Sequence, residues 1–137
     1  MSAENKAIIR RMIDEVWNQK NLAAVENFAA ADCIGHAPTG VEVRGPDGIR
    51  QNVTRFITAF PDLHLTIEDM IAEGDKVVMR FTSRGTHQGE FLGIVPTGKQ
   101  VSVTATGTYR MENGKIKEGW VNQDLFGLVQ QLGVTFK

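Results

Sequence analysis

The stretch that decides the fold is GKIKEGWVNQDLFGLVQQLG, residues 114–133. Its first half alternates as a strand does, because successive strand residues point to opposite faces of a sheet. Strict alternation puts the following residues on one face: Ile116, Glu118, Trp120, Asn122 and Asp124. The second half has apolar residues at helical spacing, with Gly133 at the expected helix end. The stretch therefore predicts a strand followed by a helix, with polar side chains sharing the face of an isoleucine and a tryptophan.

Two interpretations of these polar residues remain open. Asp124 stands where the strand ends and the helix begins, and aspartate is favoured there because its carboxylate accepts hydrogen bonds from free amide groups. The same carboxylate is also placed to project into the space between sheet and helices. Glu118 and Asn122 raise a related question, because alternation assigns residues to a face without saying which face is solvated.

The rest of the chain separates into helical and strand-like parts. Apolar residues repeat with a helical period within residues 8–17, 22–29 and 49–60, and Pro61 stops the third helix. Residues 63–71, 77–87 and 101–111 alternate with period two, and Asn113-Gly114 is a strong hairpin turn. Helices that segregate from strands predict an α+β fold, with helices against one face of a mostly antiparallel sheet. A length of 137 residues predicts one domain, 1–137.

Composition and charge exclude several classes of function. The net charge is −1 with both signs interspersed, so no basic stripe predicts nucleic-acid binding. No apolar run approaches the roughly 20 residues of a membrane span, and the N-terminus lacks a signal-peptide pattern. Cys33 is the only cysteine, so no internal disulfide forms. We therefore expect a soluble, cytoplasmic protein.

Scattered histidines and the absence of familiar motifs limit the chemistry. His36 lies in CIGHAPTG, and His87 continues the phase of the apolar residues in strand 77–87. Each is either a structural, hydrogen-bonded histidine or a group that faces a ligand. No zinc-ligand spacing, phosphate loop, nucleophile elbow or dinucleotide fingerprint is present, so the sequence predicts neither metal nor cofactor. Cofactor-free chemistry or plain binding remains.

Three segments resemble the SnoaL-like polyketide cyclase family. They are FPD together with GTHQGEFLGIVPTG (60–62 and 85–98), GKIKEGWVNQDLFGLVQQLG, and WNQKNLAAVENFAAADCIGHAP (17–38), so the resemblance covers nearly the whole chain. The resemblance implies the nuclear-transport-factor-like fold. In that fold a strongly curved sheet wraps with three N-terminal helices and one C-terminal helix into a cone around an apolar cavity. It also implies a homodimer.

The same resemblance implies a reaction and its residues. In the family's cyclases, an aspartate matching Asp124 is the general acid/base of an intramolecular aldol ring closure on a polyketide-like carbonyl compound. Burial in an apolar pocket would raise the pKa of that carboxylate and strengthen it as a base. The residues expected to bind the substrate are His36, His87, Trp17, Phe60, Phe91, Tyr109, Trp120 and Asn122.

Two departures from the family pattern keep other functions open. Gly107 and Gly119 stand where the family often has polar residues, and the first would normally be aimed into the cavity. The alternatives are a non-catalytic protein that binds a small apolar ligand, and an isomerase of the ketosteroid isomerase type. A protein-interaction domain is a third possibility. Whether the loop at 88–98 forms a lid is also open.

Overall fold

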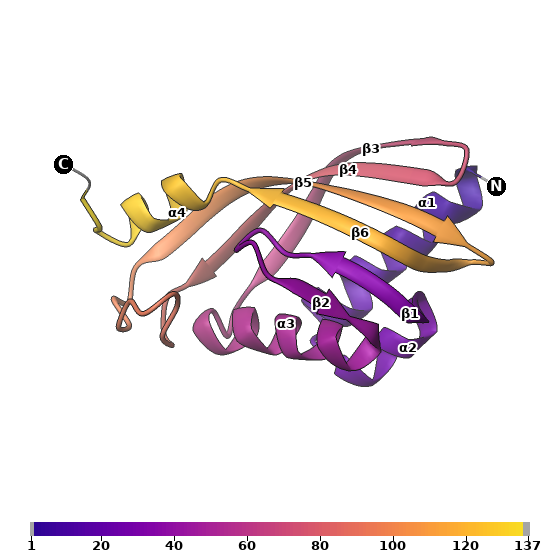
Figure 1. Cartoon of the computed structure of the whole chain (residues 1–137). Helices are drawn as coiled ribbons and strands as arrows, with labels where there is room; N and C mark the ends of the chain where they lie inside the picture. Colours follow the sequence, from indigo (N-terminus) through magenta and orange to yellow (C-terminus); the bar gives the residue numbers. More distant parts are fainter. Residues whose placement is uncertain (1, 136–137) are drawn as a thin grey trace.

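The computed structural model describes residues 2–135, in which helices pack on one face of a curved, unclosed sheet (Figure 1). The N-terminal helix α1 (Ser2–Met12) continues through a π-helical segment, η1 (Ile13–Asn18). A 3-10 turn, η2 (Leu22–Ala24), leads into the short α2 (Val25–Phe28). The longest helix is α3 (Gly45–Ala59), which has Pro46 in its first turn and ends before Pro61. The last helix is α4 (Leu125–Gln131).

Six strands form the sheet in the order β2-β1-β6-β5-β4-β3. Their bounds are β1 (Ala29–His36), β2 (Glu42–Arg44), β3 (His64–Glu73), β4 (Lys76–Thr86), β5 (Gln100–Glu112) and β6 (Lys115–Gln123). All pairs are antiparallel except β1 with β6, which is parallel. The α+β class and the mostly antiparallel sheet are therefore confirmed. The helix predicted at 22–29 is shorter, because the chain enters β1 at Ala29.

A bulge in β6 changes which residues face the helices. Arg110 of β5 pairs with Glu118, but the next residue, Met111, pairs with Ile116. Lys117 is therefore an extra residue in β6, and the alternation inverts after it. The prediction that Glu118, Trp120 and Asn122 share the face of Ile116 is wrong for this reason.

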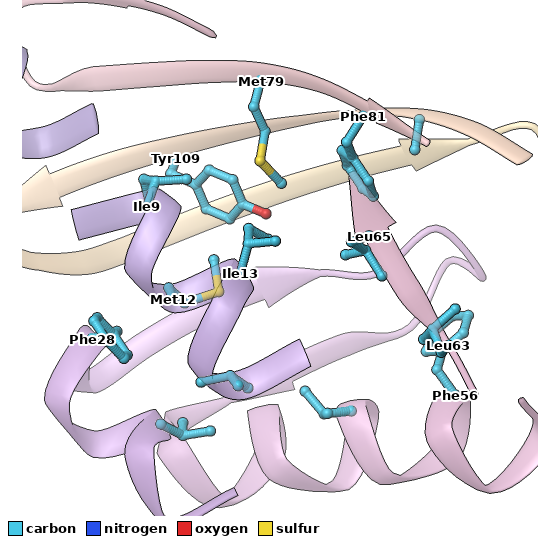
Figure 2. Packing of buried hydrophobic residues seen from close by; sticks show 14 of the residues in the cluster. Ile9, Met12, Ile13, Phe28, Phe56, Leu63, Leu65, Met79, Phe81 and Tyr109 are labelled. Carbon is cyan, nitrogen blue, oxygen red and sulfur yellow. The ribbon is translucent and has the colours of Figure 1, made fainter. Parts of the chain in front are cut away.

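The inner face of the sheet and the helices share one hydrophobic core. Ile9 of α1 and Ile13 of η1 belong to one buried cluster with Met79 and other inward-facing residues of the long strands (Figure 2). Alternation along β5 is regular, with every second residue from Val101 to Met111 buried. This packing does not fill the whole interior, and the space that remains is the candidate site.

Candidate functional site

A cavity of about 130 Å³ lies between the inner face of the sheet and the helices. Its walls are mainly apolar and come from α1, η1 and α3 on one side and from β1, β4, β5 and β6 on the other. An apolar cavity of about 150 Å³ in another protein holds a benzene molecule. The space in this conformation therefore suits a group about the size of one aromatic ring, and a larger ligand requires that the walls move.

Few polar side chains reach this cavity. Ser83, Tyr109 and Gln123 do so from the sheet, Asn52 does so from α3, and His36 and Arg84 also border it. The buried oxygens Oδ1 of Asn52 and Oε1 of Gln123 have no hydrogen-bond partner among the described residues. An unpaired buried oxygen costs free energy, and a bound ligand that donates a hydrogen bond removes that cost. These amides are therefore the natural partners for hydroxyl groups of a ligand.

Tyr109 lies flat against the sheet because two glycines leave room for its ring. A Cβ atom on Gly107 would come within 2.9 Å of the Tyr109 hydroxyl, and one on Gly119 within 3.1 Å of the ring carbon Cδ1. Gly119 is the direct neighbour of Tyr109 across the β5–β6 ladder. Burial raises the pKa of the Tyr109 hydroxyl, so the group keeps its proton at neutral pH. Gly107 and Gly119, the two departures from the family pattern, thus leave the space in which the Tyr109 ring packs.

Four of the predicted binding residues line the cavity: the three aromatic residues named next, and His36, which is described below. Trp17 of η1, Phe60 after α3 and Tyr109 of β5 contribute directly to its wall. Trp17 also meets Phe56 edge-on, with 6.0 Å between ring centroids. The aromatic side chains named from the sequence therefore form part of the wall, although most of the wall is aliphatic.

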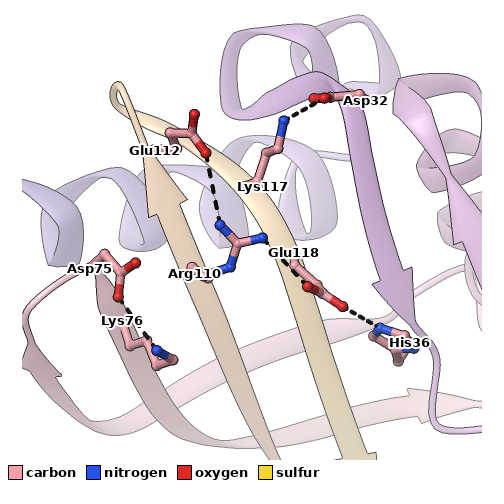
Figure 3. Close-up of polar contacts among 8 residues, drawn as sticks. All are labelled: Asp32, His36, Asp75, Lys76, Arg110, Glu112, Lys117 and Glu118. Atoms are coloured by element: carbon pink, nitrogen blue, oxygen red, sulfur yellow. Dashed lines mark hydrogen bonds and ion pairs between the residues drawn. The ribbon is translucent and has the colours of Figure 1, made fainter.

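His36 belongs to the cavity rim, but its imidazole is engaged elsewhere. Its Nε2 lies 2.8 Å from Oε2 of Glu118, and its ring stacks on the indole of Trp120 with centroids 5.5 Å apart. Glu118 also lies 3.5 Å from Nη2 of Arg110 (Figure 3). The hydrogen bond from His36 is the main cause that holds the pKa of Glu118 below its ordinary value, and Arg110 adds to it. These contacts account for the polar side chain of Glu118 on β6.

His87 and Phe91 lie outside the cavity and hold the loop at residues 88–98. His87 is fully buried, and its Nδ1 accepts a hydrogen bond of 3.1 Å from the backbone N–H of Thr97. Phe91 packs between the rings of Phe56 and Phe60. Neither residue is part of the cavity wall. Their contacts tie the base and the centre of the loop to α3 and to β4.

Trp120, Asn122 and Asp124 also lie away from the cavity. The bulge at Lys117 turns Trp120 and Asn122 to the other face, and Gly119, Val121 and Gln123 reach the wall instead. Asp124 is exposed, and its Oδ1 accepts a hydrogen bond of 2.9 Å from the N–H of Gly127. This is the geometry of a helix N-cap. Among residues 2–135, no aspartate or glutamate lines the cavity.

Sequence reasoning missed Asn52 and Gln123 as site residues. Asn52 lies on α3, where the sequence pattern is an apolar stripe. A single amide residue on such a helix does not indicate a binding site. Strict alternation puts Gln123 on the face opposite Ile116, because the bulge cannot be read from the sequence. Within the described chain, no three His, Cys, Asp or Glu side chains gather as a metal site would require. No helix in residues 2–135 is both long and apolar enough to cross a membrane.

Comparisons with known proteins place this architecture in one family. The family model for SnoaL-like polyketide cyclases matches residues 7–132. The aklanonic acid methyl ester cyclase DnrD of Streptomyces peucetius is 28% identical over 129 residues, which cover 92% of this chain and 88% of the relative.

Two solved structures extend the comparison. AclR of Streptomyces galilaeus, a candidate hydroxylase, is 33% identical with a TM-score of 0.84, over 97% of this chain and 83% of its own. A SnoaL-like protein from Jannaschia sp. CCS1 is 21% identical with a TM-score of 0.91, over 98% of this chain and 95% of its own, and shows the same fold. The match to the family model spans most of the sequence, and the sheet and helices have the architecture of these structures. The chain therefore belongs to the SnoaL-like polyketide cyclase family.

Proposed function

We propose that this protein is a cyclase that binds a small carbonyl compound in its cavity and closes a ring by an intramolecular aldol reaction through an enolate. The observation that carries the proposal is an apolar cavity with a few hydrogen-bonding groups, Tyr109, Asn52 and Gln123, that have no partners in the described chain. Such a site excludes water from the carbon skeleton and holds oxygen atoms at fixed points. That combination folds a flexible substrate into the shape of its product.

The proposed chemistry needs little from the protein beyond this. A carbon between two carbonyl groups loses a proton readily, because the resulting negative charge spreads over both oxygens. The enolate carbon then forms a bond to a second carbonyl carbon of the same molecule, and the new alkoxide takes up a proton. The reaction is already intramolecular, so the protein lowers its barrier by holding the flexible substrate in the conformation in which the two carbons are in contact.

The proton acceptor is the part of the mechanism where two versions compete. In the version that we favour, water at the cavity mouth takes the proton, because no carboxylate of the described chain lines the cavity. In the other version Asp124 takes the proton, as the family resemblance implies, and this requires that Asp124 leave its contact with Gly127. Variants of Asp124 distinguish the two.

The first substrate to test is the one that names the relative from Streptomyces peucetius, aklanonic acid methyl ester. Aldol closure without loss of water leaves the mass unchanged, so product formation appears as a new chromatographic peak of the same mass. We expect the purified protein to produce it faster than heat-denatured protein does. A chain that binds the ester tightly and leaves it unchanged would contradict the catalytic proposal.

A second candidate function is ligand binding without chemistry. The same absence of a cavity carboxylate among the described residues favours it. Under this function, saturable binding of an apolar ring compound occurs with no new product over long incubation. Isomerisation through the same enolate is the remaining chemical alternative, and the chromatographic assay detects it as well.

A further inference from the structure

We propose that the Tyr109 hydroxyl is the hydrogen-bond donor that fixes the carbonyl or enolate oxygen of the ligand in the cavity, and that Gly107 and Gly119 are the residues that aim it. The inference rests on the proposed function, because it assigns one polar contact within the same cavity. It also names the ligand class more narrowly, as a compound with an oxygen acceptor at the end of an apolar, ring-sized body.

The position of the ring carries the first step. Tyr109 is on the inner face of β5 and is 8% exposed. Figure 2 shows its side chain projecting toward Ile13 and Met79, two other residues of the cavity wall. Its hydroxyl makes no hydrogen bond to any other described residue. A hydroxyl that lines a cavity and has no partner in the described chain is open to a hydrogen-bond acceptor of a ligand.

The glycines carry the second step. A side chain on Gly107 would occupy the place now held by the hydroxyl, because its Cβ would lie 2.9 Å from that oxygen and 3.0 Å from Cε2. A side chain on Gly119 would push on the opposite edge of the ring, at 3.1 Å from Cδ1 and 3.3 Å from Cε1. A larger residue at either position would therefore displace the ring from its present place. The position where related chains often project a polar group is occupied by the tyrosine hydroxyl.

The chemistry of the donor suits an oxygen that gains negative charge. Burial moves the pKa of the hydroxyl further above neutral pH, so the group keeps its proton and can donate a hydrogen bond. A hydrogen bond from a neutral donor to a charged acceptor is about twice as strong as one between neutral groups. The contact therefore stabilises an enolate more than the ketone from which it forms, which is the requirement for lowering the barrier.

Two probes of one-ring size test the assignment without knowledge of the natural substrate. The first is 4-nitrophenol at a pH at which it is ionised, and the second is 4-nitrotoluene, which has a similar shape and no phenolic oxygen. Binding of each is measured by titration calorimetry, and the visible absorption band of nitrophenolate reports its hydrogen bonding. The protein variants are Tyr109→Phe and Gly107→Ala. Thr106→Ala, on the exposed face of the same strand, is the matched control.

We expect Tyr109→Phe to weaken nitrophenolate binding roughly 10- to 100-fold, the effect of losing a hydrogen bond to a charged group. Nitrotoluene affinity stays within about threefold, since the ring that shapes the wall is retained. Gly107→Ala weakens nitrophenolate selectively and shifts its absorption band, and Thr106→Ala changes neither. Equal losses for both probes, or no loss in Tyr109→Phe, overturn the assignment.

The remaining outcomes separate this inference from the proposed function. If the wild-type protein binds nitrotoluene but not nitrophenolate, the Tyr109 assignment falls and the cavity remains a ligand site. If it binds neither probe, the cavity does not accept ring compounds, and the proposed function fails together with the inference.

Discussion

Two substitutions of Asp124, to asparagine and to alanine, distinguish a role as a helix N-cap from a role as the catalytic base. The carboxylate accepts a hydrogen bond from Gly127 N–H at the start of α4. Asparagine caps helices about as well as aspartate, whereas alanine costs about 1 kcal/mol. A chain of 137 residues has an unfolding entropy of about 0.29 kcal/mol/K, so that loss lowers Tm by about 3–4 °C. As a cap, Asp124→Asn therefore leaves Tm nearly unchanged, and Asp124→Ala lowers it by a few degrees.

The two roles give different patterns of activity. For a cap, both variants retain the cyclisation rate and the probe affinities within a few-fold, because the carboxylate lies outside the cavity wall. For a base, both variants lose the reaction by a factor of about 10² or more, whatever happens to Tm. Thermal unfolding by circular dichroism and the chromatographic assay on the same preparations measure both quantities. A large loss of rate in Asp124→Asn with an unchanged Tm would refute the assignment as a cap and restore the predicted catalytic role.

Four further expectations follow from contacts elsewhere. His87→Ala lowers the free energy of unfolding in urea by about 2–4 kcal/mol, because it leaves a hole and an unpaired Thr97 N–H. Nitrotoluene still binds to this variant, and a loss of that binding would mean that His87 contributes to the binding site. Gln123→Met keeps or raises Tm by removing an unpaired amide oxygen, and a clear drop in Tm would mean that the amide has a partner. Hydrogen bonds from the backbone N–H of Thr86, and secondarily from its hydroxyl, lower the pKa of Asp62 in the folded protein. Asp62 therefore contributes fully to the free energy of unfolding above about pH 4, the pKa of the unfolded chain, and this contribution is lost as the pH falls through the lower pKa of the folded protein. The Tm difference between wild type and Asp62→Ala should therefore close in strong acid, and a constant difference would argue against it. The homodimer stays a prediction that light scattering checks, with a monomeric mass as the contrary result.

The helices and long strands could be predicted because their signals are local. The apolar stripe of residues 49–60 and the positive φ angles that Asn113 and Gly114 adopt in their turn require no knowledge of the rest of the molecule. The short strands β1 and β2 gave no comparable signal, since β1 depends on a parallel partner far along the chain. Residue order alone does not encode such pairings.

The site was harder to predict, because it depends on the phase of one strand. A single extra residue, Lys117, decides whether Trp120 or Gly119 faces the helices, and both registers read as plausible alternation. Trp17, Phe60 and Tyr109 were found because aromatic residues of the inner face need only the correct element. Whether a glycine weakens a site or makes room for a tyrosine is visible only when the neighbouring strand is in place.

The bulge at Lys117 also bears on how such a pocket changes over generations. Deletion of Lys117 would remove the bulge and leave the faces of β6 unchanged, because Ile116 and Glu118 already pair with neighbouring residues of β5. The wall changes only if Lys117 is retained and enters the ladder. Residues 118–123 then shift by one place along β5, so that Trp120 and Asn122 turn inward, and Gly119, Val121 and Gln123 turn outward. A codon lost at this bulge therefore leaves the pocket intact, whereas a change of register with no change of length exchanges one complete wall. When relatives with different ligands are aligned, the phase of the last strand deserves the same weight as its substitutions.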